Sequence, residues 1–557
     1  MSTAISVLGG VGLFLLGMNI MTSSLKELAG SGLRATLAKA AATPLSGTFW
    51  GAFVTLIVQS SSATTMTTIG LVSAGLLTFS QGLGLVFGAN IGTTGTAWLV
   101  ALIGVRVSLT AAALPMIFAG ALVMLLGRGR VSAAGGALAG FALVLFGLTT
   151  LQQGMGGLAE QLHPADLPAI FGPGVSWWSS LLGTLALIAV GLAMTAVMQS
   201  STAAVAVTLS AQYAGAVGLD QACALIIGQN IGTATSSALA AIGASRTAQR
   251  LALAYILFKL IAAVIALVLF PFTIPLLVQA SKSIDGVTLL ALYHTAYNVV
   301  GVAVLLPLIN RFTHFVERVL PERGSPLTRC LDPAALLTPL AAEEAVRRTV
   351  ARSLETMCGP IGETLTATIR GTSASTGKQA AAITDAGDAL NKAQEFISDA
   401  SGPPESAPEQ ERLTRTLHAL DHASRLAEVA GEKGEAGSPS LANGDARAAE
   451  LCAEAMQNAV LIGSEVGALP DDVGRVANGA LVEQAMAQLE DRAKALSELQ
   501  PAYRKVTLSS VASGALSADD AIARVDSVRW LEALARHAWR SAAHLVDNGA
   551  TDRPLPP

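Results

Sequence analysis

Two polar motifs occur in duplicate within an otherwise apolar sequence. Gln59-Ser60-Ser61-Ser62 is followed by Asn90 within Gly88-Ala89-Asn90-Ile91-Gly92-Thr93-Thr94. Gln199-Ser200-Ser201-Thr202 is followed, at the same interval from Gln to Asn, by Asn230 within Gly228-Gln229-Asn230-Ile231-Gly232-Thr233. Uncharged polar residues beside glycine let a membrane helix unwind, because their side chains replace the lost backbone partners. The unwound carbonyls can coordinate Na⁺, and the exposed helix N-termini can bind an anion.

Acidic residues are scarce around these motifs. No Asp or Glu lies between Glu27 and Glu160, and Asp220 is the sole acid between Asp166 and Asp285. Proton-coupled carriers usually need a titratable acid inside the membrane, and Asp220 falls at the expected end of a segment. The pattern therefore favours sodium over protons as the coupling ion, with no cofactor expected besides it. Individual sodium ligands are not assigned.

The chain divides by composition near residue 320. Over its 557 residues 52% are hydrophobic and 13% charged, and the mean hydropathy is +0.54. Residues 1–320 carry 12 basic and 6 acidic residues, whereas the remainder carries 23 and 33. The first part is typical of a protein embedded in a lipid bilayer, and the second of a soluble acidic domain. A nucleic-acid partner is not expected.

Apolar segments long enough to cross a bilayer recur up to residue 309. They predict an all-α, polytopic membrane transporter domain over 1–320, made of two repeats with broken helices at about 10–130 and 138–270, and a final span at 288–309. Inverted repeats are common in such transporters, so inversion is favoured. A linker is expected over 321–341. Alanine-rich segments with helical periodicity predict a soluble α-helical bundle over 342–550.

Two other classes of protein are disfavoured. Serine-rich stretches also mediate close helix packing in membranes, but two copies with matching spacing argue against packing alone. An intramembrane enzyme is disfavoured because neither copy contains Gly-x-Ser-x-Gly, and His294 has no acid near it to orient it. A membrane-anchored regulatory scaffold would need one span rather than many.

The doubled motif resembles that of the type II sodium-dependent phosphate cotransporters, over about residues 5–315. Tyr293-His294-Thr295-Ala296-Tyr297-Asn298 also resembles a His-x-x-Phe-Asn segment in the family's last span. The resemblance implies sodium-coupled symport of inorganic phosphate across the cell (inner) membrane by alternating access. Export of phosphate, or transport of a related oxyanion, is the alternative. The residues implied to bind substrate and sodium are Gln59, Ser60, Ser61, Ser62, Asn90, Thr93, Thr94, Gln199, Ser200, Ser201, Thr202, Asn230 and Thr233.

The sequence departs from the family pattern at three places. Thr202 replaces the last Ser of the second motif and keeps a hydroxyl, while Gln229 stands where the first copy has Ala89. Electrogenic vertebrate members carry an acid shortly after the first Asn-Ile-Gly-Thr, whereas residues 103–107 contain none. Sodium stoichiometry and electrogenicity are therefore open, as are transport direction and oligomeric state, with a homo-oligomer compatible with the sequence.

The soluble part weakly resembles the PhoU family of helical phosphate-regulatory proteins. Residues 420–426 and 528–538 carry the resemblance, which implies a cytoplasmic location and a regulatory role. The resemblance also makes a membrane-anchored PhoU-type regulator the alternative from a different class. His418 and His422 share a helix face, but without a carboxylate cluster a solvated face is favoured over a pair of metal ligands.

Overall fold

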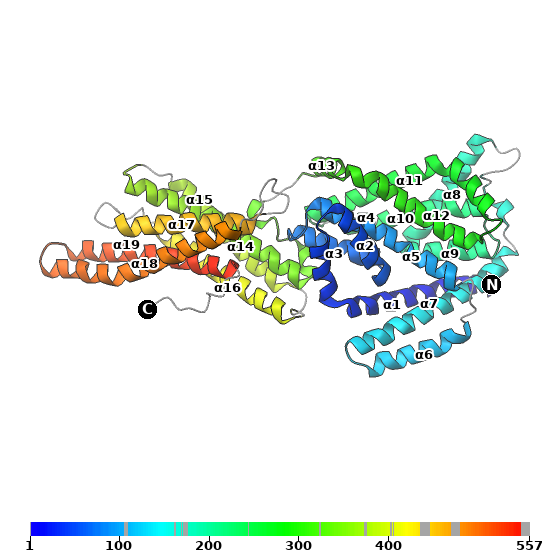
Figure 1. Ribbon diagram of the computed structural model, residues 1–557, viewed down its shortest axis with the longest axis horizontal. Coiled ribbons are helices and arrows are strands. Elements are labelled where there is room, and N and C mark those ends of the chain that lie inside the picture. The colour runs from blue at the N-terminus through cyan, green and yellow to red at the C-terminus, as the bar shows by residue number, and fades with distance from the viewer. Residues whose placement is uncertain are drawn as a thin grey trace. The chain divides into compact units, whose positions relative to one another are not determined.

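The structure is a computed structural model that describes residues 2–104, 110–160, 163–168, 170, 176–242, 244–321, 325–372, 376–400, 404, 406–434, 446–468 and 479–546. Within these ranges the chain is helical and splits into two compact units. The first comprises residues 1–69 and 79–322, and the second comprises 70–78 and 323–557. The all-α fold class expected from the sequence is thus confirmed (Figure 1).

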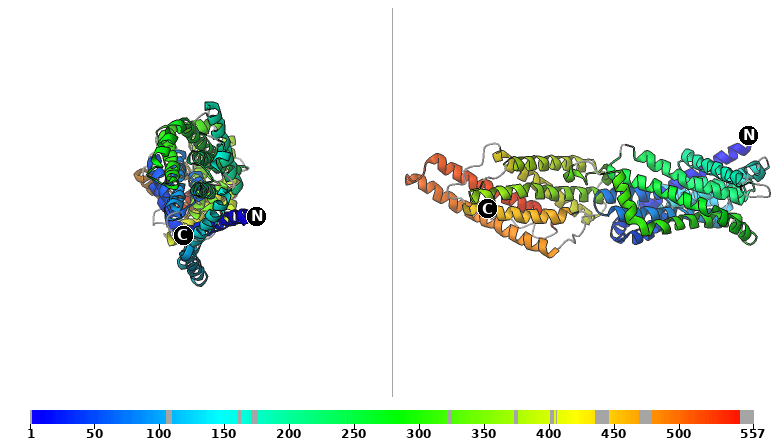
Figure 2. Two further views of the ribbon diagram at one scale, coloured as in Figure 1. Left: turned by 90° about the vertical axis from the view of Figure 1, so that its right-hand side faces the viewer. Right: turned by 90° about the horizontal axis from the view of Figure 1, so that it is seen from above.

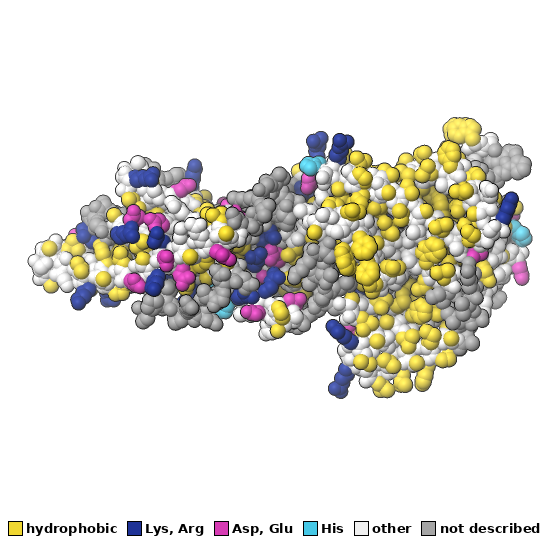
Figure 3. All heavy atoms as spheres, in the orientation of Figure 1, with side chains coloured by type: hydrophobic (Ala, Val, Ile, Leu, Met, Phe, Trp, Pro, Cys, Tyr) yellow, Lys and Arg dark blue, Asp and Glu magenta, His cyan; other side chains and the backbone are white. Residues whose placement is uncertain are grey.

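The first unit is built from apolar helices. Among the residues that the structure describes, six helices are long and apolar enough to cross a membrane, and shorter apolar helices accompany them. Its helices are α1 (Ser2–Ala40), α2 (Pro44–Val58), α3 (Ser61–Ser73), α4 (Phe79–Thr93), α5 (Gly95–Leu99), α6 (Thr110–Leu126), α7 (Arg130–Ala159), α8 (Trp177–Met198), α9 (Ser201–Tyr213), α10 (Leu219–Ala240), α11 (Arg246–Ala280), α12 (Gly286–Leu305) and α13 (Ile309–Val319). Residues 70–73, at the end of α3, belong to the second unit. A π-helical turn, Val100–Gly104, follows α5. Hydrophobic side chains make up much of the visible surface of this unit (Figure 3), as expected for a protein that contacts lipid.

One helix pair in the first unit occurs twice, once in each copy of the polar motifs. Helix α1 packs along α7, α2 packs against α4, and α8 packs against α10. Both the α2–α4 pair and the α8–α10 pair flank a short polar helix, α3 in one case and α9 in the other. The apolar stretch from Pro44 to Ser73 is divided at Gln59 and Ser60 between α2 and α3. The break falls within the polar motif.

The second unit is a bundle of long helices (Figure 2) with charged outer faces (Figure 3). Helix α14 packs against α15, α16 and α17, and α19 packs against α16, α17 and α18. Alanine, leucine and methionine side chains from all six helices form one buried core. The helices are α14 (Pro339–Ile369), α15 (Thr376–Ser398), α16 (Ala407–Gly434), α17 (Ala446–Gly467), α18 (Gly479–Ala512) and α19 (Ala518–Leu545).

Asp332 is hydrogen-bonded to the segment Gly70–Thr78, which belongs to the second unit. Its buried carboxylate accepts a hydrogen bond from Ser73 Oγ at 2.7 Å and caps the 3₁₀ turn Pro333–Leu337 through the Ala334 N–H at 2.9 Å. Asp332→Ala leaves both donors without their acceptor, which costs about 1–3 kcal/mol of stability per unsatisfied buried group. We expect a lower melting temperature by circular dichroism of the full chain in detergent. Asp385→Ala, at an exposed position of α15, is the control and should melt like the wild type.

Candidate functional site

Each polar motif begins with a glutamine in the left-handed backbone region. Gln59 ends α2 with a φ of 55°, and Gln199 ends α8 with a φ of 50°. These are the only non-glycine residues with positive φ in the part of the chain that the structure describes. A side chain in this region costs about 1–2 kcal/mol. Strain kept at two equivalent positions indicates a functional constraint.

The two glutamine side chains make the same contacts in both copies. Each amide nitrogen donates to a carbonyl of the preceding helical turn, Leu56 for Gln59 and Ala196 for Gln199. The side-chain oxygen of Gln59 accepts from Thr96 Oγ1 at 2.6 Å. That of Gln199 accepts from Ser236 Oγ at 2.9 Å. Thr96 and Ser236 are themselves at equivalent positions of the two copies. Each glutamine therefore links its helix break to the segment that carries, or directly follows, the Gly-x-Asn-Ile-Gly-Thr motif of its own copy.

The serines that follow start the next helices. Ser60 Oγ accepts from the Ala63 N–H at 3.2 Å, and Ser200 Oγ accepts from the Ala203 N–H at 3.3 Å. Ser200 also shares a hydrogen bond of 3.0 Å with Thr202. The remaining motif residues, Ser61, Ser62, Ser201 and Thr202, lie in the first turns of α3 and α9. The first N–H groups of a helix lack partners within it, so these two starts can donate to an anion.

Glycines let the paired helices approach backbone to backbone. A Cβ on Gly88 would overlap the carbonyl oxygen of Thr48, and one on Gly228 would overlap that of Ile188, both at well under 3.0 Å. Both contacts involve backbone atoms, which cannot turn aside. The glycines of Gly-x-Asn-Ile-Gly-Thr therefore fix the spacing of α4 against α2 and of α10 against α8.

Alanine at either glycine is expected to destabilise the first unit. Gly88→Ala and Gly228→Ala each force two helices apart, and we expect a loss of about 3 kcal/mol or more, at the upper end of overpacking effects. The measurement is the melting temperature in detergent, followed by size-exclusion chromatography. Gly156→Ala on α7 is the matched control, because its Cβ would meet nothing within 4 Å. Equal melting temperatures for all three variants would contradict the assigned helix spacing.

One cavity brings the two motif copies together. Thr93 from α4 and Ser201 and Thr202 from α9 line it. Its volume is about 10 Å³, so it holds no more than one water molecule. An anion larger than water would need the helices around the cavity to move. The other lining residues are Thr96, Ala97, Val100, Val205, Ala206 and His294.

The other predicted site residues do not line this cavity. Asn90 is buried and donates to the Val86 carbonyl of its own helix at 2.9 Å. Thr94 accepts from Thr295 Oγ1 at 3.1 Å, a contact that joins the first motif to α12. Of the predicted set, the residues not among those lining the cavity are Gln59, Ser60, Ser61, Ser62, Asn90, Thr94, Gln199, Ser200, Asn230 and Thr233.

Asn230 of the second motif lies in a buried polar chain. Its side-chain oxygen Oδ1 accepts from the ammonium of Lys259, and its side-chain amide donates to Asn298 Oδ1 at 3.1 Å. Asn298 in turn donates to the carbonyl of His294 at 2.8 Å, and His294 lines the cavity. The chain of contacts therefore connects a lysine on α11 to the place where the two motif copies meet.

Lys259 is a functional candidate that the sequence analysis did not single out. It is 2% exposed, and its ammonium lies 5.3 Å from the centre of the Tyr255 ring. The sequence between Asp220 and Asp285 contains no acid to neutralise it. A charged residue inside a membrane segment costs about 2.5–3.5 kcal/mol or more, and such residues mark functional sites. That rule, applied to α11, is the signal that could have found it.

Thr233 and Gln229 complete the second copy. Thr233 Oγ1 donates to the carbonyl of Asn230 at 2.7 Å and accepts from the Tyr255 hydroxyl at 3.3 Å. Gln229, which replaces Ala89 of the first copy, donates to Thr208 Oγ1 at 2.6 Å and to the Ala204 carbonyl at 3.1 Å. This departure therefore ties α10 to α9, a link that alanine at position 89 cannot make.

These features define a multi-pass membrane transporter with two helix breaks whose polar motifs contribute to one small cavity. Residues 13–153 and 180–292 match the model of the Na⁺/Pi-cotransporter family, and this membrane part of the chain belongs to that family. The resemblance stated for it from the sequence is confirmed. The family consists of transporters, so the protein is a transporter and not an enzyme.

Curated relatives align with a large part of the chain. YqeW of Bacillus subtilis (strain 168) is 28% identical over 56% of this chain and 96% of its own length. The "Putative inorganic phosphate export protein YjbB" of Escherichia coli (strain K12) is 30% identical, and the alignment spans 63% of each protein. The "Sodium-dependent phosphate transport protein 2A" of Rattus norvegicus is 36% identical over 99 residues, which is 15% of that protein. No solved structure matches the chain.

Proposed function

We propose that the protein carries inorganic phosphate across the cell membrane and couples this movement to sodium. The observation that carries the proposal is the cavity lined by Thr93 of the first copy and by Ser201 and Thr202 of the second copy. Hydroxyl groups can donate to the oxygens of phosphate and accept toward Na⁺. The family match and the names of the relatives support phosphate as the substrate.

Sodium coupling is supported by the charges around the site. The helices that carry both motif copies contain no acid apart from Asp220, at the start of α10. Lys259 places a buried amine near the second copy, and sodium would supply positive charge when a multiply charged anion binds. The assignment of individual residues of the predicted set to sodium binding or to phosphate binding is likewise part of this proposal.

Export of phosphate is the second candidate for the direction of transport. It is favoured by the printed name of YjbB, with which the chain aligns over 63% of that protein. In either direction the binding site and the alternating-access cycle would be the same, and the gradients in the cell would set the net flux.

Proteoliposomes test both the substrate and the coupling. Radiolabelled phosphate uptake is measured with an inward gradient of sodium, of potassium or of protons, and efflux is measured from preloaded vesicles. The proposal expects uptake with sodium alone, saturating in phosphate. Equal uptake with a proton gradient, or none with sodium, would overturn the coupling. Efflux that does not respond to sodium would separate an independent exporter from a reversible symporter.

The second unit is proposed to be a cytoplasmic, PhoU-like regulatory domain. Its six-helix bundle, acidic composition and charged surface are compatible with a soluble environment. Protease treatment of sealed cells and of inverted membrane vesicles tests the location. Cleavage within residues 323–557 only in the inverted vesicles would support the cytoplasmic assignment, and cleavage in sealed cells would contradict it.

A further inference from the structure

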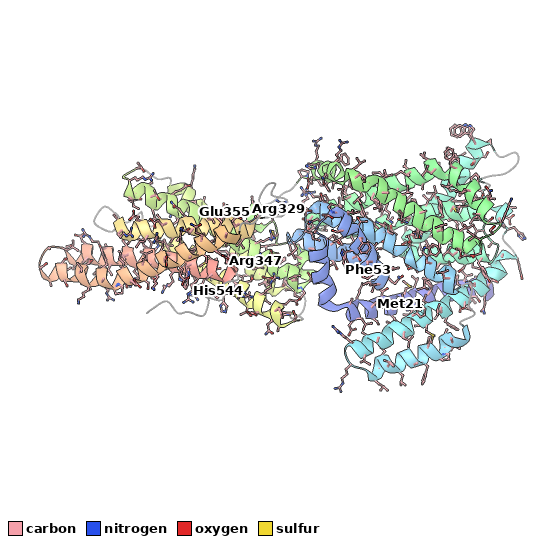
Figure 4. The ribbon with its side chains drawn as sticks, in the orientation of Figure 1. Met21, Phe53, Arg329, Arg347, Glu355 and His544 are labelled. Carbon is pink, nitrogen blue, oxygen red and sulfur yellow. The ribbon has the colours of Figure 1, made fainter. Side chains whose placement is uncertain are left out.

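Four of the seven histidines of the chain gather on one side of the second unit. His418 and His422 lie one turn apart on α16, and His537 and His544 lie on α19, which packs against α16. The ring centres of His418 and His544 are 5.0 Å apart, those of His422 and His537 are 5.5 Å apart, and those of His422 and His544 are 6.0 Å apart. Figure 4 labels His544 near the end of α19.

Two of these rings are already spaced like ligands of one metal ion. The Nδ1 atoms of His422 and His537 are 3.3 Å apart. Two imidazole nitrogens bound to Zn²⁺ at about 2.0–2.1 Å in tetrahedral geometry lie about 3.3–3.4 Å from each other. Without metal, one ring donates its Nδ1 hydrogen to the other. With metal, both Nδ1 lone pairs would point at the ion, and each ring would carry its hydrogen on Nε2.

Burial, together with the charges around the pair, lowers the pKa of both rings. Burial lowers the pKa of His537 to about 4, assisted by Arg536, His422 and Arg425 and opposed by Asp421. Burial also lowers the pKa of His422; Asp421 raises it, and Arg540, His418 and Arg425 lower it further. Neutral imidazole is the form that binds transition metals. The same arginines repel a cation, so the affinity for metal should be moderate.

A third ligand must come from a neighbouring ring. No three His, Cys, Asp or Glu side chains in the described part of the chain are already placed to hold a metal ion. His544 is partly buried and stacks on His422, with the two ring planes 11° apart. A metal site formed with this pair requires the His544 side chain to rotate so that a ring nitrogen faces the pair. We propose that His422, His537 and His544 bind a transition-metal ion such as Zn²⁺, with water as the fourth ligand.

The proposal goes beyond the transport function and does not depend on it. The solvated helix face expected for His418 and His422 rested on two histidines alone, whereas α19 adds two more from a distant part of the chain. The competing interpretation is that the four rings merely fill the seam between α16 and α19. In that case the bundle would not bind metal.

Zinc titration of the full chain distinguishes the two interpretations. The protein is purified in detergent through a tag free of histidine, treated with chelator, and titrated with Zn²⁺ by calorimetry and against a chromophoric chelator. We expect one Zn²⁺ per chain with a micromolar Kd. His422→Gln and His537→Gln should each weaken binding at least tenfold, and His314→Gln, an exposed histidine of α13, should not change it. Circular dichroism checks that each variant is folded.

Co²⁺ binding to the unaltered protein provides a second measurement if a variant does not fold. A tetrahedral site with three imidazoles gives intense visible absorption, and Zn²⁺ should displace it at one equivalent. Failure of the wild-type protein to bind Zn²⁺ in the micromolar range would overturn the proposal. Undiminished binding in folded His422→Gln and His537→Gln would also overturn it, as would the weak spectrum of octahedral Co²⁺.

Discussion

Alanine in place of Gln59 or of Gln199 is expected to reduce sodium-driven phosphate transport by about 100-fold or more, since displacing a site by as little as about 1 Å can cost that much. Each glutamine joins a helix break to the segment that carries or follows the Gly-x-Asn-Ile-Gly-Thr motif of its own copy. The contact is made through Thr96 in one copy and Ser236 in the other. Without the side-chain amide, this contact no longer fixes the positions of the starts of α3 and α9 relative to the cavity. The measurement is initial uptake of labelled phosphate into proteoliposomes.

Glycine variants at the same positions distinguish the effect of losing the side-chain amide from the effect of backbone strain. Both glutamines have positive φ, which glycine adopts without strain. Gln59→Gly and Gln199→Gly should therefore be at least as stable as the alanine variants while transport stays lost. Gln279→Ala, at an exposed position of α11, is the control and should transport normally. Wild-type rates in the alanine variants would show that the glutamine side chains have no role in the site.

The duplicated motif and the helical fold could be predicted because both depend on local sequence. Polar residues beside glycine mark a break in an apolar helix, and the structure places breaks at Gln59 and Gln199. The equal spacing of the two copies further predicts equivalent surroundings. The close contacts of Gly88 and Gly228, each with a backbone carbonyl oxygen at the equivalent position of its own copy, follow this symmetry.

The contacts between distant helices could not be predicted in the same way. In the sequence, Lys259 is an isolated charge within the apolar part of α11. The fold places it against Asn230 of α10, and Asn298 of α12 contacts the same Asn230 side chain. The pairing of Thr94 with Thr295 likewise joins segments far apart in the sequence. Spacing within one segment carries no information about such contacts. The inversion of the repeats and the roles of individual site residues therefore stay predictions.

Lys259→Met is expected to impair transport without harming the fold. Methionine is similar to lysine in length, so the space in α11 stays filled, but Asn230 loses the ammonium that donates to its side-chain oxygen. A hydrogen bond to a charged group is worth about 1.5–3 kcal/mol, which corresponds to a loss of roughly 10- to 150-fold in rate if it acts in the transport cycle. Removing a buried charge also removes its desolvation cost. The melting temperature should therefore stay equal or rise.

Opposite effects on stability and transport would identify Lys259 as part of the transport machinery rather than of the core. Lys259→Arg keeps the charge but not the compact ammonium, so partial activity is expected. Lys282→Met, at an exposed position after α11, is the control for loss of one positive charge and should transport like the wild type. If Lys259→Met transports normally, the polar chain through Asn230, Asn298 and His294 is structural. If it unfolds, the lysine stabilises the helices it contacts. Loss of transport at unchanged stability would place Lys259 in the transport cycle. The apparent affinities of the variant for phosphate and for sodium, measured separately, would then show which of the two ions depends on the buried ammonium for binding.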